Sequence, residues 1–201
     1  MVSQVRRFSE TRRVGHIGTL DPFASGVLPI AVGRATRLAD TLHTFPKTYL
    51  ADIRFGLGTT TRDIEGEPVG DYNPHTPTRD EVEHALLRFV GEIEQTPPAF
   101  SAARIGGRRA HELARAGEEV HLEPRRVTIY SATVRSRRRD RVEIEVECST
   151  GTYIRSLAVD RVGNHRPPLS AREDRSRPTN TRRRDDGRGD RGGDYTRQDT
   201  R

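Results

Sequence analysis

Residues 15–26 read Gly-His-Ile-Gly-Thr-Leu-Asp-Pro-Phe-Ala-Ser-Gly, and the interpretation of the whole chain starts from this stretch. Three glycines in twelve residues indicate a turn, because glycine weakens helices and strands and lets a ligand approach the backbone closely. Pro22 fixes the chain after Asp21 and disfavours a helical backbone at Asp21. The stretch therefore presents one carboxylate in a tight turn. Most Asp-Pro pairs are ordinary turn residues, so the residues alone leave a structural role for Asp21 open beside a functional one.

The net charge of +6 is unevenly distributed along the 201 residues. Residues 161–201 hold 12 arginines against 7 acidic residues, so this segment alone carries +5. The first 160 residues are close to neutral, and the high isoelectric point does not by itself make them a nucleic-acid binder. Lys47 is the only lysine. We interpret the arginine excess as codon bias, because either residue can serve as a charge toward phosphate.

Several function classes are excluded by what the sequence lacks. Cys148 is the only cysteine, so the chain can form neither an internal disulfide nor a thiolate metal cluster. It contains no Cys/His ligand spacing, no phosphate-binding Gly-x-x-x-x-Gly-Lys and no dinucleotide fingerprint, so none of these motifs indicates a metal or cofactor. No apolar stretch approaches the length of a membrane span and no signal-peptide core is present, which predicts a cytoplasmic protein.

Apolar spacing predicts helices and strands in one mixed α+β domain over residues 1–160, with a mostly antiparallel sheet and flanking helices. The clearest helix begins at Thr78, where Glu81 completes a capping box, and ends before Gly91. Further helices are expected at 2–8, 34–42, 109–115 and 151–159, and strands at 49–57, 126–135 and 142–148. Residues 95–100 contain two prolines and are expected to be extended or turning.

Two arginine-rich segments have alternative interpretations. Residues 135–141 are expected to form a solvated hairpin loop, with a dedicated RNA contact as the alternative. Residues 161–201 lack apolar periodicity, so they cannot bury enough surface to offset their ordering entropy and are predicted to be disordered. Our hypothesis for this tail is a shifted reading frame, and the alternative is an arginine-rich arm that binds RNA.

Five blocks of the sequence resemble, in the same order, those of TruB-class pseudouridine synthases. The resemblance covers about residues 2–160 and implies a pseudouridine synthase fold with a bacterial-type insert at roughly 67–120. The blocks are Gly15-His16-x-Gly18-Thr19-Leu20-Asp21-Pro22-x-Ala24-x-Gly26-x-Leu28-Pro29; Lys47-Thr48-Tyr49 with Phe55-Gly56; Thr59-x-Thr61-x-Asp63-x-x-Gly66; Gln95-x-Pro97-Pro98-x-Phe100-Ser101-Ala102 with Gly107-Arg108-Arg109 to Gly117; and Cys148-Ser149-x-Gly151-Thr152-Tyr153-Ile154-Arg155-Ser156-Leu157.

The resemblance also implies a reaction, which is the isomerisation of a uridine in the T-loop of tRNA to pseudouridine without a metal or cofactor. Asp21 would be the covalent nucleophile, Arg155 would pair with it and hold it ionised, and Tyr49 would stack on the flipped base. Asp63 would brace Arg155, and His16 would lie near the flipped nucleotide. Gly18, Thr19 and Tyr153 complete the expected substrate-binding residues. The expected partner is the T-arm of tRNA, bound by a monomer.

The chain departs from the family pattern at both ends. The family's first strand, with its Lys-Pro-x-Gly segment, has no counterpart here, and residues from 161 onward match none of the family's closing elements. Missing strands would expose sheet edges, so we expect weak stability and low or absent activity. A non-catalytic remnant that binds tRNA is therefore the alternative function. A guide-RNA-dependent synthase is disfavoured by the bacterial-type insert.

Overall fold

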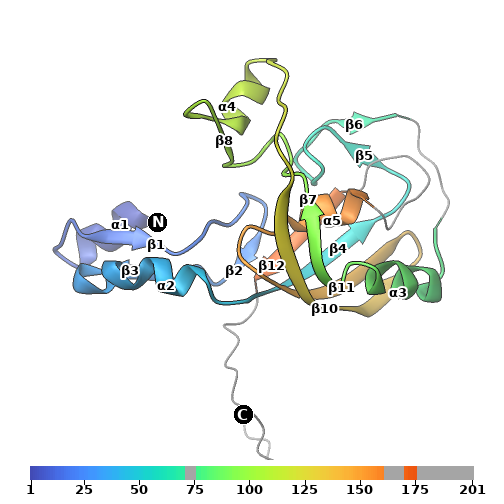
Figure 1. Ribbon diagram of the computed structural model, residues 1–201, viewed down its shortest axis with the longest axis horizontal. Coiled ribbons are helices and arrows are strands. Elements are labelled where there is room, and N and C mark those ends of the chain that lie inside the picture. Colours follow the sequence, from blue (N-terminus) through green and yellow to red (C-terminus); the bar gives the residue numbers. More distant parts are fainter. Residues whose placement is uncertain (71–75, 161–169, 176–201) are drawn as a thin grey trace, which may run out of the picture.

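The computed structural model describes residues 1–70, 76–160 and 170–175. Among these residues, six strands form one sheet whose neighbours are all antiparallel except β12 and β2 (Figure 1). The expected mixed, mostly antiparallel sheet is therefore confirmed. In spatial order the strands are β2 (Ser25–Gly26), β12 (Ser170–Arg175), β4 (Lys47–Arg54), β11 (Arg141–Cys148), β10 (Arg125–Arg138) and β7 (Gly91–Gln95).

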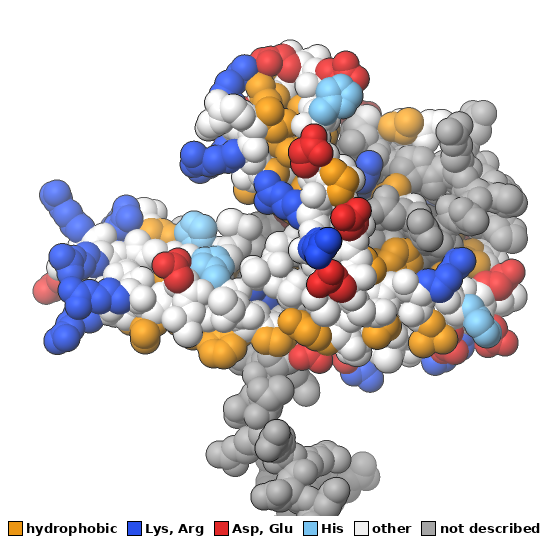
Figure 2. Space-filling model, in the orientation of Figure 1, with side chains coloured by type: hydrophobic (Ala, Val, Ile, Leu, Met, Phe, Trp, Pro, Cys, Tyr) orange, Lys and Arg blue, Asp and Glu red, His pale blue; other side chains and the backbone are white. Residues whose placement is uncertain are grey.

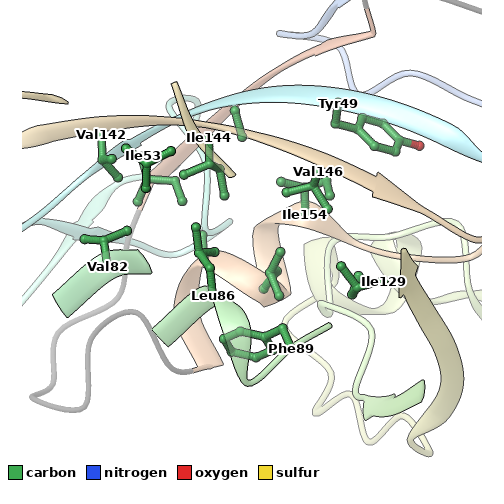
Figure 3. Packing of buried hydrophobic residues seen from close by; sticks show 14 of the residues in the cluster. Tyr49, Ile53, Val82, Leu86, Phe89, Ile129, Val142, Ile144, Val146 and Ile154 are labelled. Atoms are coloured by element: carbon green, nitrogen blue, oxygen red, sulfur yellow. The ribbon is translucent and has the colours of Figure 1, made fainter. Parts of the chain in front are cut away.

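One face of this sheet carries the core, covered by α3 (Arg79–Leu87) and α5 (Ile154–Asp160). Buried and partly exposed residues alternate along β4 and β11, as in strands with one buried face. Figure 3 shows the inward-pointing Ile53 and Ile144 above Leu86 of α3. Each of these three side chains is at most 1% exposed, and each such burial stabilises the fold by about 1.5–3 kcal/mol.

The N-terminal residues form a unit beside the sheet, at the left of Figure 1. Strands β1 (Val14–His16) and β3 (Ile30–Val32) pair antiparallel, so the loop between them has both ends fixed. Helix α1 precedes this pair, and the 3-10 helix η1 and helix α2 follow it. Their bounds are Val2–Phe8 for α1, Gly33–Leu38 for η1 and Ala39–His43 for α2, close to the helices expected at 2–8 and 34–42.

Two smaller pieces extend from the sheet. Strands β5 (Gly58–Thr59) and β6 (Pro68–Val69) pair after β4. The short strands β8 (Arg104–Ile105) and β9 (Arg108–Arg109) pair before α4 (Ala110–Arg115), and this part of the chain stands away from the sheet in Figure 1. None of the described helices is long and apolar enough to cross a membrane.

The arginine-rich hairpin differs from its prediction. Strands β10 and β11 continue almost to the turn, which contains only Arg139 and Asp140, so the loop expected at 135–141 is wrong. An ion pair between the strands supports the extension, because Arg135 lies 2.7 Å from Glu145. The hairpin is nevertheless exposed to solvent at most of its arginines.

Strand β12 lies inside the segment that was predicted to be disordered. It pairs antiparallel with β4 from Ser170 to Asp174, so disorder at 170–175 is wrong. Backbone N–H and C=O groups make this pairing, and apolar periodicity, on which the prediction rested, does not report on backbone pairing. The rest of the predicted disorder, at 161–169 and 176–201, lies outside the described residues. With β11 on one side and β12 on the other, β4 is not an exposed edge.

Candidate active site

The turn at Asp21 lies in the loop that joins β1 to β3. The Asp21 carbonyl accepts the N–H of Ala24 at 3.0 Å, which closes a β-turn with Pro22 at its second position. Gly18 has a φ of 95°, a backbone conformation that other residues rarely adopt. His16 Nδ1 lies 2.5 Å from the Gly18 carbonyl, so this nitrogen is the donor and the turn is held on its N-terminal side. The local sequence thus fixes where the carboxylate points.

A pocket of about 280 Å³ opens in front of Asp21. Asp21 has 30% of its side chain exposed, which leaves the carboxylate accessible from this pocket. Segments distant in the sequence form its wall: the β1–β3 loop, the end of α2, the start of β4 and the loop before α5. The lining residues are His16, Gly18, Thr19, Asp21, His43, Lys47, Tyr49, Thr150, Gly151, Thr152 and Tyr153.

Arg155, the second residue of α5, is 3% exposed and faces Asp21 with its guanidinium. Its Nε lies 2.8 Å from Asp21 Oδ2, and its Nη1 lies 3.2 Å from Asp63 Oδ2. Nη1 also donates to the Thr61 carbonyl at 2.9 Å, and Nη2 donates to the Phe100 carbonyl at 3.0 Å. Within the described residues no acceptor lies in line with the Nε–H bond, so the contact with Asp21 is an ion pair without a linear hydrogen bond.

Asp63 is 5% exposed and is held by its own loop. Its Oδ1 accepts the hydroxyl of Thr61 at 2.5 Å and the N–H of Glu65 at 3.0 Å, which leaves Oδ2 for Arg155. The Thr59 hydroxyl donates to the Asp63 carbonyl at 2.6 Å. A carboxylate whose lone pairs are used in this way is fixed before any ligand arrives. Asp63 therefore fixes the guanidinium through Nη1, while Nε faces the pocket carboxylate.

Burial raises the pKa of the Asp21 carboxyl above its ordinary value of 3.8. The Arg155 charge lowers this pKa, as expected for an opposite charge, but by less than burial raises it, and the Asp63 charge adds to the rise. The folded protein therefore binds a proton at Asp21 more readily than the unfolded chain does. Ionisation of Asp21 therefore lowers the free energy of unfolding. The loss is complete above the pKa of Asp21 in the folded protein and disappears well below pH 3.8.

Tyr49 belongs to both the core and the pocket. It is 7% exposed and is part of the buried cluster, yet it also lines the pocket. In Figure 3 it lies at the end of the cluster with its hydroxyl directed away from the aliphatic side chains. An aromatic ring at such a border offers its apolar surface to a planar ligand while the sheet holds its backbone.

The structure brings all the site residues predicted from sequence into one region. Six of them line the pocket, and the buried Arg155 and Asp63 support it through Asp21. Sequence reasoning missed the other five lining residues, among them His43 and Lys47; the rest are Thr150, Gly151 and Thr152. Lys47 donates to the carbonyls of His43 and Phe45, so it ties the end of α2 to the start of β4. Lys47 stands directly before Thr48-Tyr49 in a quoted motif block, whereas His43 stands outside every block.

No group of three or more His, Cys, Asp or Glu side chains in the described parts of the chain is arranged to hold a metal ion. The acidic residues nearest the pocket, Asp21 and Asp63, share the guanidinium of Arg155. The single positive charge of that guanidinium offsets one of the two carboxylate charges.

Comparison with known proteins decides the family. Residues 6–154 match the family described as "TruB family pseudouridylate synthase (N terminal domain)". The chain belongs to the TruB family. This TruB chain is 47% identical over 165 residues to "tRNA pseudouridine synthase B" of Clostridium kluyveri and 48% identical over 163 residues to the protein of that name from Symbiobacterium thermophilum. The matches cover 82% and 80% of this chain but 56% and 54% of the relatives, so the chain spans about half their length.

Solved structures agree with the TruB assignment at the level of the fold. The structure titled "Crystal Structure of a Cbf5-Nop10-Gar1 Complex" has a TM-score of 0.60 and 27% identity, and the match covers 86% of this chain and 43% of that one. "Structure of H/ACA RNP bound to a substrate RNA containing 2'-deoxyuridine" has a TM-score of 0.56 and 24% identity, with 87% and 41% covered. The pseudouridine synthase fold expected from sequence is thereby confirmed.

Proposed function

We propose that this chain is the catalytic part of a tRNA pseudouridine synthase that isomerises a T-loop uridine, with Asp21 as the nucleophile. The observation that carries the proposal is the pairing of a partly exposed Asp21, at the pocket, with the buried Arg155. Such a carboxylate is accessible to a ligand and is oriented by a buried cation, as a covalent nucleophile requires. The curated relatives named above act as further support.

The reaction rearranges bonds within one uridine and consumes no second reactant. A carboxylate oxygen of Asp21 attacks either the sugar carbon C1′ or a carbon of the base, and the bond from N1 to C1′ breaks. The freed uracil rotates, C5 forms the new bond to C1′, and the Asp21 carboxylate is released. The proton on C5 leaves and N1 gains one, so no atom or electron is gained or lost overall. No step draws on a metal or redox cofactor, which stays a prediction.

The other site residues have roles that follow from their positions. Arg155 orients Asp21 and opposes the rise in its pKa, and Asp63 holds Arg155 in place. Tyr49 and Tyr153 line the pocket with aromatic rings on which a flipped base can stack. His16, next to the Asp21 turn, would contact the nucleotide at the pocket mouth.

Charge on the N-terminal unit supports an RNA substrate. Figure 2 shows basic side chains gathered at the end of the molecule formed by α1 and its neighbours. Arginines of the sheet mostly face carboxylates, whereas six exposed arginines of this unit form no ion pair with any described residue. Unpaired arginines on one surface attract a phosphate backbone. They are Arg6, Arg7, Arg12, Arg13, Arg34 and Arg37.

A tritium-release assay tests the proposal. The substrate is a T-arm transcript carrying 5-tritiated uridine at the target position, and the proteins are the wild type, Asp21→Asn and the control Asp40→Asn, which changes an exposed carboxylate of α2. We expect slow release by the wild type, equal release by the control, and a fall to the background of the assay in Asp21→Asn. T-arm binding without release in all three proteins would instead identify a non-catalytic tRNA-binding remnant. A synthase that needs a guide RNA would release tritium only when that RNA is added.

A further inference from the structure

Gln95, the last residue of β7, binds the backbone of Tyr153 with both ends of its side-chain amide. Oε1 accepts the Tyr153 N–H at 2.7 Å, and Nε2 donates to the Tyr153 carbonyl at 3.0 Å. The same carbonyl accepts the N–H groups of Ser156 and Leu157, both at 3.1 Å. Tyr153 is therefore the residue at which α5 starts, and Gln95, at 3% exposure, acts as a buried cap from another element.

This cap belongs to a larger contact between residues 95–100 and the first turn of α5. The Ser156 hydroxyl donates to the Thr96 carbonyl at 2.9 Å, and Arg155 Nη2 donates to the Phe100 carbonyl at 3.0 Å. Residues 95–100 thus hold the backbone of Tyr153 and the side chain of Arg155, and both residues belong to the site. Tyr153 lines the pocket, and Arg155 faces Asp21.

A carboxamide of this length is what the position requires. One buried side chain supplies an acceptor to the Tyr153 N–H and a further donor to its carbonyl. Methionine has similar length but would leave the Tyr153 N–H without its acceptor and would remove the donor that Gln95 adds to the carbonyl. An ionised glutamate would place a second oxygen against the carbonyl, whereas a protonated one would again offer one donor and one acceptor.

We propose that Gln95 is a positioning residue, whose amide on Tyr153 sets Arg155 against Asp21. This inference rests on the proposed function. Gln95 does not line the pocket, so it acts on turnover through Arg155. Because a misplacement of about 1 Å at reacting groups can cost about 10²-fold in rate, loss of the amide contacts lowers kcat by about that factor. KM for the T-arm changes much less than kcat, because the exposed arginines proposed to attract the RNA lie outside this contact.

The test compares Gln95→Met and Gln95→Glu with the wild type and with Thr78→Ala. Thr78→Ala removes the cap of α3, a helix that contributes no residue to the pocket, and so serves as a matched loss of capping. Three readouts are taken: thermal unfolding, kcat and KM against pH, and the NMR signal of the Arg155 Nε–H, assigned by its loss in Arg155→Lys. The NMR signal reports the position of Arg155 without any turnover.

In Gln95→Met we expect the Arg155 signal to move and kcat to fall about 10²-fold, whereas Thr78→Ala changes unfolding alone. In Gln95→Glu we expect activity relative to the wild type to recover as the pH falls, because protonation restores the donor. The inference would be overturned if Gln95→Met kept the wild-type NMR signal and the wild-type kcat. If Gln95→Met does not fold, a loss of activity in Gln95→Glu that does not change with pH would overturn it instead. Absence of wild-type tritium release would refute the proposed function, while the NMR comparison would still decide the role of Gln95.

Discussion

The surroundings of Asp21 act on the pKa of its carboxyl in opposite directions, and the result favours catalysis at some cost to folding stability. Burial and the charge of Asp63 favour its neutral form, and the charge of Arg155 favours its ionised form. The net rise in pKa means that the ionised carboxylate is less stable in the fold than in the unfolded chain. A carboxylate under such conditions is a better nucleophile than a fully solvated one, because fewer water molecules must leave it.

The pH dependence of turnover follows from that rise. Since the nucleophile must be ionised, kcat/KM should increase with pH through the pKa of Asp21, and the midpoint of this acid limb should lie above 3.8. Asp63→Asn should move the midpoint to lower pH, because the Asp63 charge raises the pKa of Asp21. The same variant should lower kcat, because Arg155 loses one of its anchors. Tritium release measured at intervals of half a pH unit reads both effects.

Asp52→Asn is the matched control for the acid limb. Asp52 pairs with Arg141 at 2.9 Å on the outer face of the sheet and lies outside the pocket. Its removal should leave the midpoint where the wild type has it. A midpoint that moves upward in Asp63→Asn would contradict the electrostatic account of the site.

At the scale of the element, the loop from Thr59 to Gly66 is a rigid support for Arg155. A Cβ added at Gly66 would overlap Thr61, whose backbone N would lie at only 2.7 Å. Thr61 is the residue whose carbonyl accepts from Arg155 and whose hydroxyl binds Asp63. Space at Gly66 is therefore part of the support of the site.

Gly66→Ala should consequently disturb the site through this loop. We expect a stability loss of about 1–3 kcal/mol, as for other overpacked positions, and a fall in kcat of up to about 10²-fold because Arg155 shifts. Urea unfolding and tritium release measure the two effects. Gly15→Ala is the control, since a Cβ there meets nothing within 4 Å. Equal behaviour of the two variants would show that the close approach at Gly66 does not constrain the loop.

Helices and strands whose sequence pattern lies within a few residues were predictable. Those that form only by pairing with a segment far along the chain were not. The capping box of Thr78 and Glu81 lies within one turn, and the structure has it as expected in α3. Strand β7 contains a single apolar residue, Ile93, between glutamates, so its sequence carries no strand pattern, and its ladder with β10 defines it. The site shows the same division. Asp21 was predictable from a contiguous motif, whereas the role inferred for Gln95 depends on backbone atoms 58 residues away.

At the scale of the molecule, the site lies where the N-terminal unit meets a self-contained core. The buried cluster is formed entirely by side chains between Tyr49 and Ala158, from the central strands and from α3 and α5. Asp21 lies outside this cluster, whereas Tyr49 belongs to the cluster and Arg155 lies on α5, which packs in it. Correct pairing of Asp21 with Arg155 therefore reports that the N-terminal unit has docked on the core.

Strand β12 gives a prediction about the whole molecule, because it protects the side of β4 that faces away from β11. In a chain that ends at residue 160, the core cluster remains complete, so the fold should survive. The amides at 50–54 that pair with β12 would become an open edge and should exchange with solvent about 10-fold faster or more. Hydrogen–deuterium exchange of the two chains measures this, and amides at 125–129, which pair with β7, are the internal control. Equal exchange at 50–54 in both chains would mean that β12 does not pair with β4 in solution.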